Sequence, residues 1–253
     1  MRRIFALLLC LVAWPAQAQE AIVADLSQKE VAITATFTGS EILIFGAVKR
    51  GDEVDDTHPL QAVITVSGPE VPVTVRKKDR VAGIWVNTEE VTVDAAPSFY
   101  AISASGALED VISETEDLRY NISKERAIRL VGEAGEVTDP INFRDALIRI
   151  REGSGAYRRD ETGVVVLEEA LFRSSIGLPA NLVEGDYTVK IFLTRDRSVV
   201  STFETTIDVR KVGLERFLYT LARQQPLVYG LMSLAIAIAA GWLASAAFRV
   251  LRP

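Results

Sequence analysis

An acidic loop carries the residues whose types and spacing best suit metal chemistry. Its candidate ligands lead up to the only histidine of the chain: Asp52, Asp55, Asp56 and His58. Carboxylate oxygens and one imidazole are ligands for Ca²⁺ or for a harder transition ion. The spacing matches no established calcium loop, so a solvated connection between strands is favoured and a metal site is the alternative.

Arrangements suited to catalysis are weaker. A Ser-His-Asp triad would have to recruit His58, and the Gly-x-Ser-x-Gly motif of a nucleophile elbow does not occur. Ser103 and Ser105 near a predicted strand end are a weak signal. Glu89 and Glu90 are adjacent in a strand context, so they point to opposite faces and are unsuited to joint acid–base work. We therefore expect no enzyme activity and no cofactor.

A basic cluster follows a predicted strand: Arg76, Lys77, Lys78 and Arg80. It suits an acidic partner or lipid headgroups, and a polar hairpin end explains it equally well. Trp85 and the Phe99-Tyr100 pair are expected in the core, because their neighbours alternate as buried strands do.

The first residues have the layout of a secretory leader. Arg2 and Arg3 precede an apolar stretch at residues 4–14, and Ala16-Gln17-Ala18 supplies a small-x-small cleavage site. Residues 1–18 are therefore a predicted signal peptide. Because Cys10 is the only cysteine, the processed chain is expected to have no disulfide and no thiolate metal site.

Near the other end, residues 227–248 contain no charged side chain. At ~1.5 Å of rise per residue, a helix of this length crosses a hydrocarbon core of ~30 Å. Since the leader places the body outside the cytoplasmic membrane, we expect a single-pass bacterial inner-membrane protein. Residues 19–226 would lie in the periplasm, and residues 249–253 would form a cytoplasmic stub.

Two features of this end suit lateral contacts. Small residues recur every fourth position of the predicted span, either as a helix-packing face or as ordinary composition: Ser233, Ala237, Gly241 and Ser245. Before the span, residues 212–225 are predicted to form an amphipathic collar helix that meets headgroups, a partner or the exported body. Its apolar face includes Leu214, Phe217, Leu218 and Leu221.

Alternation of apolar and polar residues predicts sheet in the body. Residues 31–37 and 42–48 are predicted to form one hairpin, and residues 62–67 and 71–76 a second strand pair around Gly68-Pro69. Later, Pro140 begins a predicted helix that ends near Gly153. Further strands are predicted at residues 164–167, 170–176, 187–193 and 199–209.

Turn signals at short intervals indicate a mainly β chain with one or two antiparallel, immunoglobulin-like β-sandwich domains. We divide the exported part into a β-sandwich domain at residues 19–108 and a second β-rich domain with a short helical excursion at residues 109–211. The charge balance excludes a nucleic-acid partner, because 28 Lys and Arg stand against 34 Asp and Glu and give a formal net charge of −6.

Several motifs occur in a recognisable order: Gly46-Ala47-Val48, Gly68-Pro69, Gly83-Ile84-Trp85-Val86-Asn87, Pro97-Ser98-Phe99-Tyr100-Ala101, Gly185-Asp186-Tyr187-Thr188-Val189 and Gly241-Trp242-Leu243-Ala244. Together they resemble the alphaproteobacterial putative transmembrane protein family over essentially the whole chain. The resemblance implies a compartment and a topology but supplies no catalytic residues. It also implies a transporter partner, because members are often encoded beside sulfite-exporter-like permeases.

The sequence therefore predicts a non-catalytic accessory or scaffold subunit of a membrane complex. Its partners would be the lipid bilayer and another membrane protein or a second copy of itself. The alternative is a membrane-anchored module that binds a ligand or a metal in the periplasm.

Overall fold

The computed structural model describes residues 20–34, 36–49, 58–129, 140–168, 170–213 and 221–251. The predicted leader, residues 1–18, lies outside these residues. The chain divides into two units: most of it up to residue 209 forms a β-rich body, and residues 32–37 with the chain from residue 210 onward form the second unit. The fold is mainly β, as predicted.

One layer of the body is a sheet of four antiparallel strands in the order β1–β3–β10–β9. Side chains alternate between its faces, so Ile42, Ile44 and Phe172 are buried while their sequence neighbours point outward. The strands are β1 (Ala21–Leu26), β3 (Ser40–Lys49), β10 (Leu171–Leu178) and β9 (Val164–Leu167).

The second layer is a sheet of six strands in the order β2–β12–β11–β4–β7–β8. β4 pairs antiparallel with β11 and β7, and β7 pairs parallel with β8. Chain segments before and after residue 108 therefore supply strands to the same two sheets. The strands are β2 (Glu30–Ile33), β12 (Ser198–Lys211), β11 (Gly185–Arg195), β4 (Gln61–Ser67), β7 (Tyr100–Ala104) and β8 (Tyr157–Asp160).

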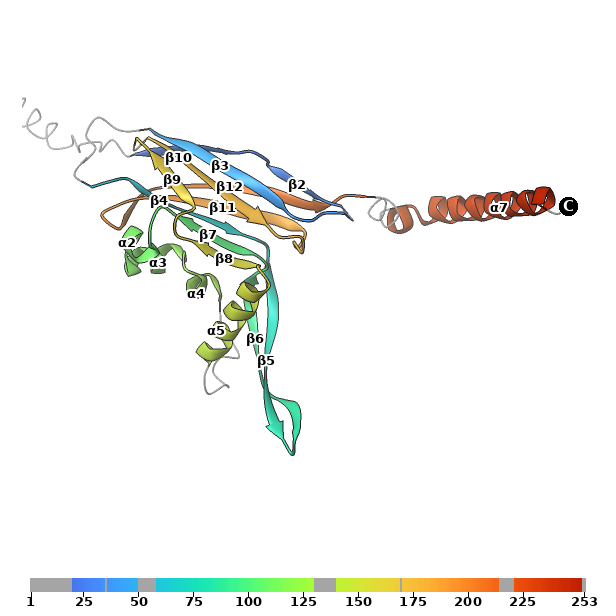
Figure 1. Cartoon of the computed structure of the whole chain (residues 1–253), viewed down its shortest axis with the longest axis horizontal. Coiled ribbons are helices and arrows are strands. Elements are labelled where there is room, and N and C mark those ends of the chain that lie inside the picture. The colour runs from blue at the N-terminus through green and yellow to red at the C-terminus, as the bar shows by residue number, and fades with distance from the viewer. Residues whose placement is uncertain are drawn as a thin grey trace, which may run out of the picture. The chain divides into compact units, whose positions relative to one another are not determined.

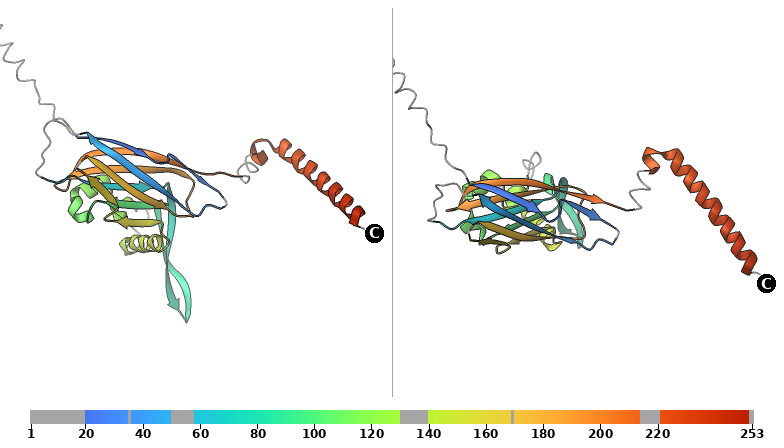
Figure 2. Two further views of the ribbon diagram at one scale, coloured as in Figure 1. Left: turned by 45° about the horizontal axis from the view of Figure 1, so that its top comes forward. Right: turned by 90° about the horizontal axis from the view of Figure 1, so that it is seen from above.

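The two sheets face each other, and a third layer covers the other face of the six-stranded sheet (Figures 1 and 2). The side chains of Ser103 on β7 and Ser174 on β10 form a buried hydrogen bond of 2.9 Å between the sheets. On the covered face, Phe143 and Leu147 join a core with Phe192. The helices of this layer are α2 (Leu108–Val111), α3 (Glu114–Tyr120), α4 (Lys124–Ala127) and α5 (Pro140–Gly153).

A two-stranded ribbon, β5 (Glu70–Val81) and β6 (Ile84–Pro97), projects from the body (Figure 1). Its root is buried at Val75, Val91 and Val93, where it contributes to the core beside α5. Beyond Val75 every residue of β5 is exposed. A two-residue turn closes the tip, with φ of +51° at Ala82 and +88° at Gly83. We refer to residues 76–90 as the distal ribbon.

Both locally predicted hairpins at the start of the body are wrong. β2 lies beside β12 in the six-stranded sheet, whereas β3 lies between β1 and β10 in the other sheet. β4 pairs with β7 and β11, while β5 leaves the sheet to pair with β6. A turn sequence marks a change of direction, but long-range burial decides which strand the chain then joins.

The second unit contains a long apolar helix, α7 (Pro226–Leu251), which includes the predicted span. Within the described ranges, Pro226–Ser245 is the one segment long and apolar enough to cross a membrane, with a mean hydropathy of 2.0. Of the predicted collar helix, residues 221–224 are helical, and Leu214, Phe217 and Leu218 lie outside the described residues.

Candidate functional site

The helix-covered face of the six-stranded sheet turns polar at one end. Phe192 on β11 belongs to the apolar core of this face, whereas Thr188 and Lys190, which share the face by alternation, line a cavity. On the neighbouring strand β4, Thr65 and Ser67 line the same cavity. Along both adjacent strands, the side chains on this face therefore go from apolar to polar.

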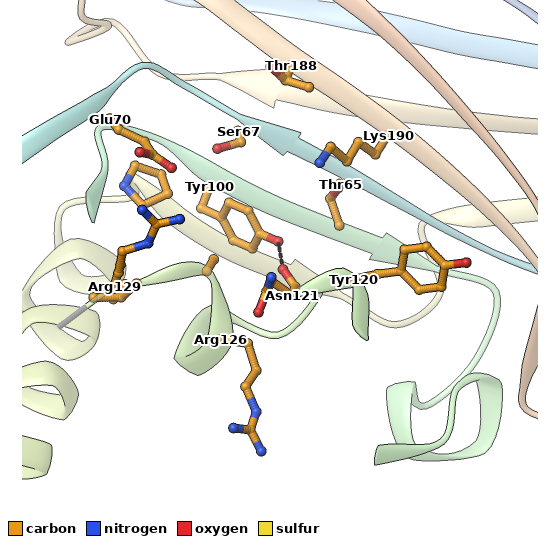
Figure 3. Close-up of a pocket in the computed structure, with 13 residues that line it drawn as sticks. Thr65, Ser67, Glu70, Tyr100, Tyr120, Asn121, Arg126, Arg129, Thr188 and Lys190 are labelled. Carbon is orange, nitrogen blue, oxygen red and sulfur yellow. Dashed lines mark hydrogen bonds between the residues drawn. The ribbon is translucent and has the colours of Figure 1, made fainter. Parts of the chain in front are cut away.

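This polar cavity has a volume of about 410 Å³ (Figure 3). Strands β4, β7 and β11 supply one side, and α4 with the segment that follows it supplies another. Its charged lining residues are three cations and one carboxylate: Arg126, Arg129, Lys190 and Glu70. Lys190 is also 3.8 Å from the Glu204 carboxylate, measured between Nζ and Oε2. The lining is suited to binding a polar group with negative charge.

Tyr100 is a buried lining residue of this cavity whose side chain makes hydrogen bonds. Its hydroxyl donates to the carbonyl oxygen of Ile122 at 2.8 Å. It also donates to the carbonyl oxygen of Asn121 at 3.2 Å (Figure 3). Burial, with a further contribution from the negative charge of Asp117, raises the pKa of Tyr100 far above its ordinary value of 10. Tyr100 is therefore neutral at physiological pH and fixes the loop after α3 against β7.

The two serines considered as nucleophiles have structural partners. Ser103 is buried between the sheets in its hydrogen bond with Ser174. The Ser105 hydroxyl accepts a hydrogen bond of 3.1 Å from the backbone N–H of Ala62. Both side chains thus join strands, and neither lines the polar cavity.

The predicted acidic loop is described only at its end. His58 is exposed, while Asp52, Asp55 and Asp56 lie outside the described residues. The backbone carbonyl of His58 accepts a hydrogen bond from Arg195, which also forms a buried ion pair of 3.1 Å with Glu20. Among described residues, no three His, Cys, Asp or Glu side chains gather closely enough to hold a metal ion.

The outer face of the four-stranded sheet is largely apolar. One row of outward residues crosses the sheet. Ala47 on β3 faces Val23 on β1 on one side and Leu171 on β10 on the other. Leu171 in turn faces Leu167 on β9. This row crosses all four strands, and a shallow hollow of about 570 Å³ lies over it. We call the apolar face the outward residues Val23, Leu43, Phe45, Ala47, Val165, Leu167 and Leu171.

Gly46 keeps this sheet compact. A Cβ atom at this position would lie 2.5 Å from Cζ of Phe172 and 2.7 Å from the backbone oxygen of Val23. The inward side of β3 therefore has no room for a side chain there. This close approach brings β1, β3 and β10 together beneath the apolar face.

The distal ribbon exposes a second set of large apolar side chains. Trp85 is 68% exposed, Ile84 65% and Val81 52%. The prediction that Trp85 lies in the core is therefore wrong, because its strand alternates without a covering layer. The same prediction for Phe99 and Tyr100 is confirmed, since both are buried in the body.

The predicted small-residue face lies on α7. Ser233, Ala237, Gly241 and Ser245 are all helical and exposed. Space is open around the position that a Cβ atom at Gly241 would occupy. Its use as a packing face stays a prediction.

Comparisons with known proteins supply a family. Among solved structures, Spo0M, the sporulation control protein of Bacillus subtilis, aligns with a TM-score of 0.28 and 10% identity over 81% of this chain. The chain spans 56% of that protein, and a likeness this weak carries no argument. No curated protein matches the chain. The family model described as "Putative transmembrane protein (Alph_Pro_TM)" matches residues 21–250, and the chain belongs to that alphaproteobacterial family.

Proposed function

We propose that this protein is a non-catalytic, single-pass subunit of a bacterial inner-membrane complex. The β-rich body lies in the periplasm, the chain ends in the cytoplasm, and α7 is the anchor. The leader-like sequence at residues 1–18 and the apolar helix support this orientation. The role is accessory or scaffolding, and the partner is another membrane protein, such as a transporter, or a second copy of this chain.

The apolar face is the observation that carries this proposal. It is contiguous across four strands, and the opposite face of the same sheet is already used for the core. Asp25 on the edge strand β1 lies at its rim, and Arg173 on β10 lies within it between Phe45 and Val165. A broad apolar surface with a polar rim is the usual composition of a protein–protein contact. The small-residue face of α7 adds a second contact inside the membrane.

The test compares two charge insertions on exposed apolar residues. Leu171→Asp places a carboxylate in the apolar face, and Leu118→Asp places one on exposed α3, so the second variant is the control. Native gel electrophoresis of gently solubilised membranes should show a complex that persists with Leu118→Asp and is lost with Leu171→Asp. Migration of the wild-type chain as a monomer, or an intact complex in the Leu171→Asp variant, would contradict the proposal.

A binding module is the second candidate function, and the polar cavity favours it. Three cations around one carboxylate suit a small anionic ligand. Calorimetry with small carboxylates and phosphates would give heat that Arg129→Gln removes. Calorimetry with divalent ions tests the predicted loop at Asp52 to His58 separately, with His58→Ala as the variant. The absence of heat for every compound and ion would reject this candidate.

A further inference from the structure

We propose that the tip of the distal ribbon binds the surface of an anionic lipid bilayer, the one in which the protein is itself anchored. The inference requires membrane anchorage but not the partner-binding role of the apolar face. It starts from the three exposed apolar side chains at the tip, Val81, Ile84 and Trp85. An isolated two-stranded ribbon gains little stability from such residues, so their exposure points to an external contact.

The register of the ribbon sorts the tip into two faces. Val81 is opposite Ile84, so these two apolar side chains lie together on one face. Arg80 is opposite Trp85 on the other face, and Lys78 lies on the same face two residues before Arg80. One face is thus apolar at its last pair and carries Asp79, opposite Val86, at the pair before it, and the other face combines a tryptophan with two cations. Tryptophan with Lys or Arg is the composition that proteins place at the headgroup level of membranes.

The charges of the ribbon change along its length. Near the root, Arg76 pairs with Glu90 at 2.9 Å, and Lys77 lies 3.5 Å from Glu89. A register shift between Lys77 and Lys78 separates this paired stem from the tip. Beyond it, Lys78 faces Asn87 and Arg80 faces Trp85, and neither cation has an ion pair within the described part of the chain.

A cationic tip is unusual on this protein. The chain as a whole carries a formal net charge of −6. The tip has the single carboxylate of Asp79 and two cations for which the described residues provide no ion pair, although Arg80 donates a hydrogen bond of 3.4 Å to the carbonyl oxygen of Gly83. The negative charge of the body repels anionic partners. The local positive charge beside the apolar side chains of the tip attracts them, so the tip is the part of the body suited to an anionic surface. Anionic lipid headgroups supply that charge, and the acyl region below them accepts Val81 and Ile84.

The start of the ribbon lies near β12, the last strand of the body. Val209 of β12 is in register with Gly185, and a Cβ atom at Gly185 would lie 3.0 Å from Pro69, directly before β5. From the end of β12, residues 212–225 lead to α7 and span at most about 50 Å when extended. The exposed part of β5 alone extends roughly 20 Å at ~3.3 Å per residue. A short tether keeps the anchoring bilayer at high effective concentration for the tip.

The test uses Trp85 as its own reporter in the full chain. The chain has three tryptophans, so a Trp14→Phe and Trp242→Phe background leaves Trp85 as the single fluorophore. The protein is placed in nanodiscs of phosphatidylcholine, with or without phosphatidylglycerol, that contain nitroxide-labelled lipid. We expect Trp85 emission to shift to shorter wavelength and to be quenched by the nitroxide in the anionic discs.

Paired variants separate the tip from general electrostatics. Lys78→Gln with Arg80→Gln should lower the ratio of quenched to unquenched Trp85 about thirty-fold, since each cation near an anionic surface contributes about five-fold. Lys29→Gln, in the connection between β1 and β2, with Lys49→Gln, at the end of β3, removes the same charge from the body away from the ribbon, and we expect it to leave quenching unchanged.

Three outcomes would overturn the inference. Emission that stays at long wavelength and open to iodide in both kinds of disc would show a tip that remains in water. A shift that appears only when membrane proteins are added to the discs would show a protein site. The third outcome concerns protein in neutral discs to which labelled anionic vesicles are added. If the vesicles quench Trp85 but labelled lipid in the protein's own disc does not, the tip binds a bilayer other than the one that anchors the protein. The native-gel test of the apolar face is independent of all three.

Discussion

The central strands of the body and the distal ribbon are both antiparallel sheet, yet they use their side chains in opposite ways. In β4, in β7 and in the second half of β11, from Ile191 to Arg195, nearly every side chain is buried, because another sheet covers one face and helices cover the other. In the distal ribbon nearly every side chain is exposed. Strand sequence alone does not determine burial; the layers that cover a strand do.

The difference in burial means that the central strands stabilise the fold, whereas the distal ribbon is free to contact another surface. A residue buried between layers contributes transfer free energy and packing, so its replacement is costly. A residue of the distal ribbon has few neighbours, so its identity affects stability little. The ribbon can therefore present Trp85 and its cations as a contact surface without loss to the fold.

The largest predicted effect compares two isoleucines. Ile191→Ala in β11 removes a side chain with 0% exposure and should lower the free energy of unfolding by about 3–4 kcal/mol. Ile84→Ala at the ribbon tip should change it by less than about 0.5 kcal/mol. Denaturant unfolding of the full chain in detergent measures both. Similar losses for the two variants would show that the ribbon is part of the cooperative fold.

A second comparison concerns ion pairs. Glu20 binds Arg195 at 3.1 Å with both side chains buried, whereas the Arg76–Glu90 pair of the ribbon is exposed. Removing one partner of a buried pair leaves an uncompensated charge, so Glu20→Gln should cost about 3 kcal/mol. Glu90→Gln should cost less than about 1 kcal/mol. The same unfolding experiment decides, and a larger loss for Glu90→Gln would contradict the comparison.

The body should also lose stability at alkaline pH. Burial raises the pKa of Tyr157 to about 12, and its hydroxyl donates to the carbonyl of Pro97 at 2.8 Å. Because the unfolded tyrosine ionises near pH 10, the folded state holds its proton longer, and this contribution to stability is lost as the pH rises from about 10 to 12. Thermal melts should show this loss, and Tyr157→Phe should make it smaller. The distal ribbon contains no tyrosine, so an unchanged slope in that variant would direct attention to Tyr100.

A smaller effect is expected at Gly46. Gly46→Ala places a Cβ against Phe172 and the β1 backbone, which should cost about 1–3 kcal/mol and disturb the apolar face. Gly153→Ala at the end of α5 meets open space and serves as the control. Melting temperatures of the two variants measure the difference. A Gly46→Ala protein as stable as the control would mean that the strands can separate there without cost.

Local patterns predicted elements better than their partners. Alternation predicted strands at residues 187–193 and 199–209, and Pro140 with Gly153 marked the bounds of a helix; these elements are confirmed as β11, β12 and α5. The hairpins after β2 and β4 were wrong because distant strands compete for the same edges. The exposure of Trp85 was missed for a related reason, since the local sequence of a strand does not indicate whether another sheet or a helix covers it.

The polar cavity was only partly readable from sequence. Thr65 and Ser67 share one face of β4, and Thr188 and Lys190 share one face of β11, as alternation alone indicates. Their convergence depends on the β4–β11 pairing, which joins segments far apart in the chain. The predicted membrane span needed no such long-range information, because length and apolar composition are local properties.

Hydrogen–deuterium exchange on the full chain tests the contrast between body and ribbon most directly. The protein is compared in detergent micelles and in anionic nanodiscs, with peptides from β4, β11 and residues 76–90 followed in each. The account predicts slow exchange of β4 and β11 in both, and slow exchange of residues 76–90 in the discs alone. Equal exchange of the distal ribbon in micelles and discs would contradict it.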